Sequence, residues 1–200
     1  MRKNQVIEKN INKISIIGAS GTGKTTLSDN LGQVLNLPVY HLDGINYFKN
    51  WEKRDKEERD KIIAQIIDKD RWVMDGTYNS TLKQRLKNSD LIIYLDYSSV
   101  SQVKGVIGRY IKKHGKERKE ILGCEERMSL EFLLWVVNWR KNKRANILNI
   151  ISEINNEKVL IFKNRRNLNK WFRDNFNTKM VVRWVMELLF RDCQFNIRYI

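Results

Sequence analysis

A glycine-rich segment at residues 18–25 constrains the fold of this chain more than any other part of the sequence. It reads Gly18-Ala19-Ser20-Gly21-Thr22-Gly23-Lys24-Thr25 and matches the pattern G-x-x-x-x-G-K-T without a mismatch. Loops of this pattern follow a strand and open a helix. An apolar, β-branched run at 13–17 precedes the segment, and leucines at 27, 31 and 35 follow it at helical spacing. The sequence therefore predicts a strand, a glycine loop and a helix in that order.

The chemistry typical of such a loop is phosphate binding. Its backbone N–H groups converge on phosphate oxygens at the positive end of the helix dipole, and glycines at 21 and 23 let the backbone approach closely. We expect Lys24 to reach the β- and γ-phosphates of ATP, and the Thr25 hydroxyl to ligate Mg²⁺. The expected nucleotide-binding residues are Gly18, Ala19, Ser20, Gly21, Thr22, Gly23, Lys24, Thr25 and Thr26.

Four further apolar runs, at 39–42, 71–74, 91–95 and 158–162, alternate with segments of helical periodicity. This alternation is typical of βαβ units, in which helices cover both faces of a parallel sheet. The predicted fold class is α/β with three layers. About sixty residues separate the last two runs, many more than the ~10 to 12 that a crossover needs, and they predict an inserted lid.

We expect the lid at about residues 100–153. Its predicted parts are a helix at 100–112, a basic, hinge-like stretch at 114–127 and a long return helix capped by Ser129. The buried stripe of that return helix is expected to consist of Leu130, Leu133, Leu134 and Val137.

The core domain is expected to span 1–172, and residues 173–200 to form a tail. Apolar residues repeat there at helical spacing: Met180, Val181, Trp184, Val185, Leu188 and Leu189. They predict an amphipathic helix that packs against the core, with a partner or a membrane surface as the alternatives.

Composition limits the class of protein and its compartment. With 42% apolar residues, 200 residues can bury one substantial core. No apolar run approaches the ~18 residues of a membrane span, and the polar N-terminus lacks the apolar centre of a secretion signal, so we expect a cytoplasmic protein. Cys124 and Cys193 lack the spacing of a zinc site or disulfide scaffold and are expected to be reduced thiols.

The net charge of +15 suggests an anionic partner. Phosphorylated metabolites, nucleic acid and anionic membrane surfaces all satisfy that inference, and so does a basic, solvated surface without a specific ligand.

Three acidic residues, Asp43, Asp75 and Asp96, follow apolar runs and should therefore meet at the carboxyl edge of the sheet, where ligands bind. Asp43 or Asp75 could hold water on Mg²⁺ or orient a substrate hydroxyl, and each could instead start a turn or cap a helix. Asp96 fits helix capping best. His41 and His114 have no paired ligands and are assigned to no metal.

The region 13–172 resembles the adenylate kinase and shikimate kinase group of P-loop kinases. The resemblance is closer to the FlaR-like DNA topology modulation proteins, which are small adenylate-kinase-like ATPases. Beyond the glycine loop it is carried by Val39-Tyr40-His41-Leu42-Asp43, by Trp72-Val73-Met74-Asp75-Gly76-Thr77-Tyr78 and by Gly123-Cys124-Glu125-Glu126-Arg127. It implies a five-stranded sheet of order 2-3-1-4-5 and a mobile lid.

The same resemblance implies roles for individual residues. Asp75 inherits the position that holds water on Mg²⁺, and Asp43 the position of an acid that faces an acceptor hydroxyl. Arg109 matches the first lid arginine, with Arg118 a further candidate and Arg127 a third. Asn79 stands where adenylate kinases carry an arginine that grips AMP, which argues against AMP as acceptor. The segment 163–166 either borders the adenine or is an exposed loop.

The leading hypothesis is a Mg²⁺-dependent phosphotransferase that uses ATP and an unidentified small acceptor. Its expected catalytic residues are Lys24, Asp43, Asp75, Arg109 and Arg118, and its expected metal ligands are Thr25 and Asp75. One alternative is a nucleic-acid-associated ATP-binding regulator that makes only phosphate-directed contacts. The other is a nucleotide-binding switch whose output is lid closure.

Overall fold

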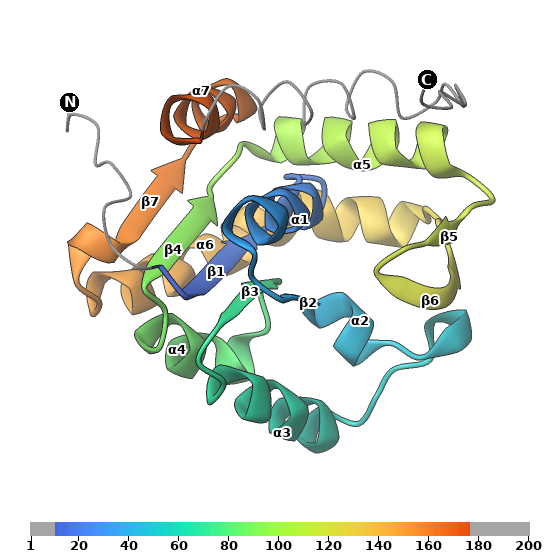
Figure 1. The fold of residues 1–200 in the computed structure, drawn as a ribbon. Coiled ribbons are helices and arrows are strands. Elements are labelled where there is room, and N and C mark those ends of the chain that lie inside the picture. Colours follow the sequence, from blue (N-terminus) through green and yellow to red (C-terminus); the bar gives the residue numbers. More distant parts are fainter. Residues whose placement is uncertain (1–10, 177–200) are drawn as a thin grey trace, which may run out of the picture.

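The computed structural model describes residues 11–176, which form a three-layer α/β fold around a parallel sheet (Figure 1). The strand order is β2-β3-β1-β4-β7, and every neighbouring pair is parallel. The strands are β1 (Lys13–Gly18), β2 (Val39–His41), β3 (Trp72–Asp75), β4 (Leu91–Leu95) and β7 (Val159–Phe162). The predicted fold class and strand order are thereby confirmed, with β7 as the fifth strand of the sheet.

Helices cover both faces of this sheet. They are α1 (Lys24–Leu35), α2 (Leu42–Asn46), α3 (Lys56–Ile67), α4 (Asn79–Lys87), α5 (Ser99–Lys113), α6 (Leu130–Ser152) and α7 (Arg165–Asn175), with 3₁₀ turns η1 (Lys49–Trp51) and η2 (Asn156–Lys158). The side chains of α1 and α7 share one apolar cluster, and those of α4 and α6 share another. A third cluster joins α3 to β3.

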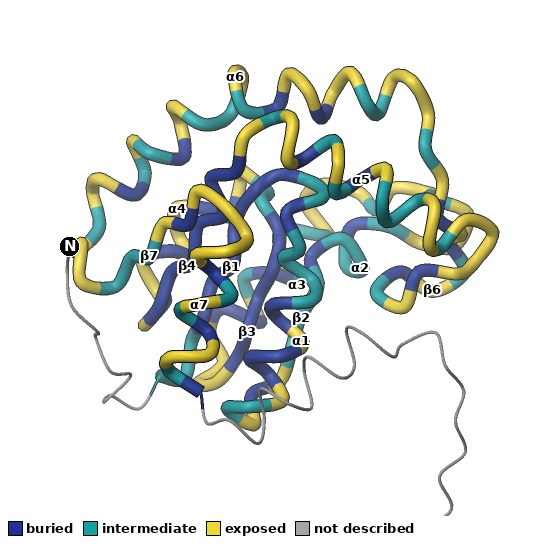
Figure 2. Tube along the Cα trace, turned by 90° about the horizontal axis from the view of Figure 1, so that it is seen from above, coloured by how far each residue is buried: buried dark blue, intermediate teal, exposed yellow. Residues whose placement is uncertain are grey.

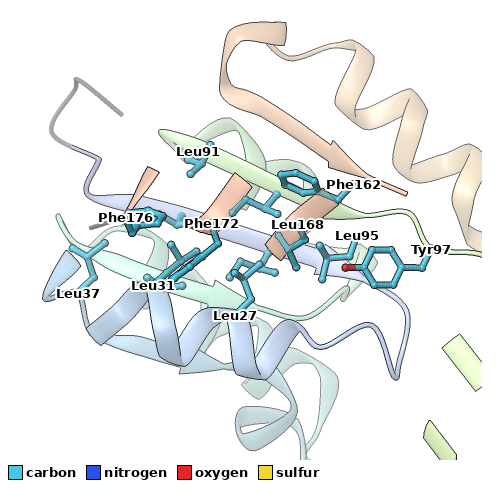
Figure 3. Close-up of a cluster of buried hydrophobic side chains, with 14 residues drawn as sticks. Leu27, Leu31, Leu37, Leu91, Leu95, Tyr97, Phe162, Leu168, Phe172 and Phe176 are labelled. Atoms are coloured by element: carbon cyan, nitrogen blue, oxygen red, sulfur yellow. The ribbon is translucent and has the colours of Figure 1, made fainter. Parts of the chain in front are cut away.

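Alternation along the strands explains why the clusters lie on opposite faces. Ile14 and Ile16 of β1 pack with Leu27, Leu31 and Phe172 from α1 and α7 (Figure 3). Ile17 points to the other face and packs with Leu82, Leu86 and Trp139 from α4 and α6. Figure 2 shows β1, β3 and β4 almost continuously buried, as expected for the central strands of a parallel sheet covered on both sides, whereas the edge strands β2 and β7 are partly exposed.

The segment 100–153, which is expected to form a lid, contains the two predicted helices, α5 and α6. The Ser129 hydroxyl accepts a hydrogen bond from Phe132 N at 3.1 Å, as expected for the N-cap of α6. The stretch expected to be hinge-like forms a β-hairpin instead, β5 (Glu117–Arg118) with β6 (Ile121–Glu125). In Figure 1 this hairpin stands beside α2, on the side of the molecule away from β7.

The predicted buried stripe of α6 is wrong. Leu130, Leu134 and Val137 are 74%, 55% and 47% exposed, while the buried residues are Val136, Trp139, Ile147 and Ile151. Apolar residues occupy every position from 132 to 137, so the sequence pattern does not define a single face of the helix. Contacts with α4, α5 and β4 decide which residues turn inward.

The C-terminal part of the described chain belongs to the core. Helix α7 continues past residue 172, and Phe176 after it packs with Phe172, their ring centroids 4.7 Å apart. The predicted amphipathic helix after residue 176 lies outside the described residues. Within residues 11–176, no helix combines the length and the apolar character needed to cross a membrane.

Helix α5 lies directly against the glycine loop. A Cβ added to Gly105 of α5 would stand 2.0 Å from the carbonyl oxygen of Gly21, and one added to Gly21 would stand 2.3 Å from the carbonyl oxygen of Gln102. Only residues without a side chain allow this backbone contact.

We predict that Gly105→Ala lowers the free energy of unfolding by roughly 1–3 kcal/mol, because an added methyl group must push α5 off the loop. The matched control is Gly108→Ala in the same helix, where an added Cβ meets nothing within 4 Å. That control should be neutral or more stable by up to about 1 kcal/mol, since Ala favours the helix. Denaturant unfolding measures the free energy of unfolding of both variants. Equal changes in Gly105→Ala and Gly108→Ala would contradict the close contact between α5 and the glycine loop.

Candidate functional site

The glycine loop presents an open helix N-terminus. Gly23, the N-cap of α1, has φ 91° and provides no side-chain cap, whereas α3, α5, α6 and α7 are capped by Asp55, Ser98, Ser129 and Asn164. The first N–H groups of α1 are therefore left for an anionic ligand.

Side chains outside and inside the loop fix its shape. The Thr77 hydroxyl, after β3, accepts from Gly18 N at 3.0 Å and donates to Gly18 O at 3.0 Å. Within the loop, the Thr22 hydroxyl donates to Ala19 O at 2.9 Å. Thr22 and Ala19 are buried and do not line the cavity described below, so their side chains support the loop rather than face a ligand.

Lys24 lies along the loop, where its Nζ donates to Ala19 O at 2.9 Å. Burial lowers the pKa of Lys24 below its ordinary value, while the nearby carboxylates of Asp43 and Asp75 favour the charged form. A phosphate group bound at the loop would add negative charge at the same place, which is a fitting partner for this ammonium group.

Asp75 is the centre of a hydrogen-bond network that joins three elements. Its Oδ2 accepts from Ser28 Oγ of α1 at 2.9 Å and lies 3.2 Å from His41 Nδ1 at the end of β2. The other ring nitrogen, His41 Nε2, lies 3.1 Å from Asp29 Oδ1 of α1. The Asp75 side chain is almost fully buried, whereas that of Asp29 is partly exposed.

His41 is the cation of this network. Burial alone would lower the pKa of His41, but its hydrogen bonds to Asp29 and Asp75 outweigh that effect and raise the pKa to about 10. The imidazole is therefore charged at neutral pH and donates from both nitrogens.

The residues beside Lys24 suit Mg²⁺. Thr25 and Asp75 offer a hydroxyl and a carboxylate, and Mg²⁺ prefers oxygen ligands, usually one or two carboxylates together with water and substrate phosphates. Ser28 and His41 both engage Asp75 Oδ2, and no hydrogen bond to Oδ1 forms within residues 11–176, so Oδ1 is the oxygen left for a hydrated cation. No group of three or more His, Cys, Asp or Glu side chains in the described part of the chain could hold a different metal.

Asp43 stands in the first turn of α2 and is held by a tyrosine. The hydroxyl of Tyr78 donates to Asp43 Oδ1 at 2.8 Å. Burial, together with the charge of Asp43, raises the pKa of Tyr78, so the phenol remains a neutral donor. The guanidinium of Arg59 lies over the Tyr78 ring, 4.9 Å from its centroid, and bonds Asn46 and Ser80.

Arg109 of α5 and Arg118 of β5, the two arginines expected in a lid, are held by glutamates. Arg109 donates to Glu126 at 2.9 Å, and Arg118 bonds Glu120 at 2.7 Å and lies 3.8 Å from Glu126. Burial works against the charges of Arg118 and Glu120, but their pairing raises the pKa of Arg118 and lowers that of Glu120. Glu126, 3% exposed, ties α5 to the hairpin strand β5.

The hairpin closes onto η1 through Trp51. The indole Nε1 donates to Glu125 O at 3.1 Å, and the guanidinium of Arg127 lies 4.9 Å from the centre of the Trp51 ring. Cys124, a free and buried cysteine, donates to Phe48 O at 3.2 Å. Arg127 therefore contributes to this contact and, unlike Arg109 and Arg118, does not line the cavity.

One cavity of ≈ 1170 Å³ joins these parts. Its wall includes Lys24, Thr25, Asp43, Arg109 and Arg118, and also Gly18, Ser20, Gly21, Gly23 and Thr26 from the loop. Asp75 lies behind His41 rather than in the wall. Asp96 faces elsewhere: it is buried and pairs with Arg140 and Arg144 of α6, while Ser98 provides the helix cap.

Sequence reasoning missed several residues of the site. Thr77, Ser28 and His41 act through hydrogen bonds between segments far apart in the chain, and His41 was assigned no role because it lacks a second metal ligand. Arg85 of α4 is fully buried and donates to Gly76 O at 2.6 Å, so it supports the turn after Asp75. Burial lowers the pKa of Arg85 to about 10. Among these residues, only Thr77 could have been found from the sequence, because it stands in the motif Asp75-Gly76-Thr77-Tyr78.

Comparison with known proteins yields structural neighbours only. Neither the family models nor the curated proteins match the sequence. The fold is similar to a shikimate kinase from Acinetobacter baumannii in complex with shikimate, at 13% identity and a TM-score of 0.49, over 92% of this chain and 96% of that one.

Two further neighbours are a gluconokinase from Sinorhizobium meliloti 1021 and a mouse sulfotransferase complexed with PAP. The gluconokinase has 10% identity and a TM-score of 0.42, over 93% of this chain and 100% of that one. The sulfotransferase has 11% identity and a TM-score of 0.47, over 98% of this chain and 70% of that one. At these scores, conclusions about the site rest on the residues of this chain.

We predict that the stabilisation supplied by His41 declines with rising pH. The folded pKa of about 10 lies above the ordinary value of 6.5, so the contribution is complete below about pH 6.5 and is lost as pH rises towards 10. Denaturant unfolding of wild type and His41→Gln, with EDTA to exclude cations, should therefore give a difference in unfolding free energy that shrinks between pH 6.5 and 10. A difference that stays constant or grows would contradict the charged network.

Proposed function

We propose that this chain is a Mg²⁺-dependent phosphotransferase that moves the γ-phosphoryl group of ATP to a hydroxyl group of a small acceptor. The observation that carries the proposal is the cavity that residues of the candidate site share. It connects the uncapped N-terminus of α1 and Lys24 with Asp43, a carboxylate oriented by Tyr78. A phosphate-binding loop and a candidate base for a hydroxyl group therefore face the same space.

The residues divide into two roles. The loop and Lys24 would bind and align the triphosphate, and Arg109 and Arg118 would neutralise the charge that develops during transfer. Asp43 would orient the acceptor hydroxyl and take its proton. The hydroxyl oxygen forms a bond to the γ-phosphorus, the bond from that phosphorus to the β–γ bridging oxygen breaks, and ADP leaves.

Thr25 and Asp75 would hold Mg²⁺, which would neutralise negative charge on the bound triphosphate. Ser28 and His41 position Asp75 for that task by holding its Oδ2. Asp75 is therefore fixed before a cation arrives, so little ordering has to occur on binding.

The resemblance to FlaR-like proteins supports this proposal at the level of an adenylate-kinase-like ATPase. Nucleic acid is not part of the proposal, because its support is the net charge of +15 and the name of the FlaR-like family, and eleven of the 38 Lys and Arg residues line the cavity. Asn79 lines the cavity at the start of α4. Because adenylate kinases carry an AMP-binding arginine at this position, Asn79 argues against AMP as the acceptor.

We expect Lys24→Ala to abolish ATP binding, because it removes the ammonium group that would contact the β- and γ-phosphates. Isothermal titration with MgATP measures this, and Lys61→Ala on the exposed face of α3 is the control that should bind like wild type. Wild-type affinity in Lys24→Ala would overturn the assignment of the loop.

We expect Asp43→Asn to keep ATP affinity and to lower phosphotransfer by roughly 10²–10⁴-fold, the usual contribution of a positioned base. The reaction is found by screening hydroxylated metabolites and nucleoside monophosphates for acceptor-dependent ATP consumption. If Asp43→Asn transfers phosphate at the wild-type rate, Asp43 is not the base.

A further inference from the structure

The wall of the cavity carries far more positive than negative charge. Eleven Lys and Arg side chains and the charged His41 line it, against three carboxylates, Asp29, Asp43 and Glu120. The Lys and Arg residues are Lys24, Lys56, Arg59, Lys104, Arg109, Lys112, Lys113, Arg118, Lys119, Lys143 and Arg165. Asp75 and Glu126 behind the wall offset only part of this excess. A triphosphate already partly neutralised by Mg²⁺ does not balance the remainder, so a second anionic ligand is favoured.

One face of α6 gives the same cavity an aromatic wall. Phe132, Trp135, Trp139 and Lys143 follow one another at spacings of three and four residues, and all four line the cavity. The rings of Phe132 and Trp135 are stacked, with centroids 5.8 Å apart and an interplanar angle of 17°. Trp135 is 48% exposed and therefore keeps a free surface for a ligand.

The orientation of α6 makes this wall more than a by-product of packing. Leu130 and Leu134, which would gain from burial, face away and are largely exposed, while partly exposed aromatic rings face the cavity. An apolar or planar ligand against the rings would remove their exposed surface from water and gain hydrophobic free energy.

The aromatic wall lies towards the acceptor end of the cavity. Phe132 and Trp135 lie in the first two turns of α6, which follows the β5–β6 hairpin. The turn of that hairpin lies against α2, the helix that carries Asp43: a Cβ added to Gly44 would stand 2.3 Å from Glu120 O. Arg165 marks the other end: it follows β7, at the sheet edge opposite β2, and lies 3.5 Å from Gly21 O. The ring of an ATP molecule would be expected on that side of the loop, away from Asp43.

From these observations we infer that the acceptor is an anionic, ring-bearing hydroxyl compound, with a flat unsaturated ring against Phe132 and Trp135 and a phosphate or carboxylate group bound by Lys143. This inference rests on the proposed phosphotransfer and names the substrate class of the same site. Ring stacking and charge pairing each contribute an amount that corresponds to roughly a three- to tenfold change in affinity.

The test uses three probes on the full chain loaded with Mg²⁺ and a non-hydrolysable ATP analogue. The probes are 1-naphthyl phosphate (ring and anion), 1-naphthol (ring only) and glycerol 3-phosphate (anion only), and calorimetry gives each dissociation constant. We expect naphthyl phosphate to bind about tenfold or more tightly than either partial probe. Equal affinities, or no binding of naphthyl phosphate, would overturn the inference.

Two variants separate the ring from the anion. Trp135→Leu should lower the affinity for naphthyl phosphate and for naphthol about five- to tenfold and leave the affinity for glycerol 3-phosphate unchanged. Lys143→Ala should lower the affinity for naphthyl phosphate and for glycerol 3-phosphate but leave the affinity for naphthol unchanged. The matched controls are Leu134→Ala and Lys141→Ala, exposed positions of α6 outside the cavity wall, which should bind all three probes like wild type.

Binding of the ATP analogue is measured first in every variant, and it distinguishes the two proposals. If the analogue fails to bind wild type, the proposed phosphotransferase fails. If the analogue binds wild type, but Trp135→Leu lowers the affinity for the analogue and not for the probes, then the aromatic wall holds the base of ATP. In that case the inference about the acceptor is wrong.

Discussion

The hydroxyl group of Thr77 is the contact on which the arrangement of the site depends. By bonding both the N–H and the C=O of Gly18, it fixes the end of β1 against the turn that follows β3. Lys24 and α1 continue from the first segment, and Tyr78 and α4 continue from the second. Together with the parallel pairing of β1 and β3, this side chain places the glycine loop and the support of Asp43 relative to each other.

The close approach of α5 to the loop is the second constraint, and it has an electrostatic consequence. The contact between Gly21 and Gly105 brings Lys104, Arg109 and Lys112 to the cavity together with Lys24. Like charges at this density repel one another, so the closed arrangement needs compensation. Glu120 and Glu126 provide it for Arg109 and Arg118, and anionic ligands would provide the rest.

Periodicity and loop chemistry predicted the main elements well, because each depends on local sequence. The strand before the loop, the parallel sheet and the cap at Ser129 follow from alternation, apolar runs and the preference of serine for N-caps. The face of α6 did not follow, because consecutive apolar residues leave the helix without a polar side. The β5–β6 hairpin was missed because a short, charged strand pair owes its position to contacts with Trp51 and Phe48 rather than to β-propensity.

The sequence by itself determined the strand, glycine loop and helix at residues 13–35, the α/β class and the expectation that Asp43 and Asp75 lie near that loop. These follow from local rules, since carboxyl ends of parallel strands meet at one edge of the sheet. Only the tertiary structure decided that Asp75 is held by Ser28 and His41 and that Trp135 faces the cavity while Leu134 faces water. Such choices depend on which segments pack together, and the energy that selects them comes from contacts between residues distant in the chain.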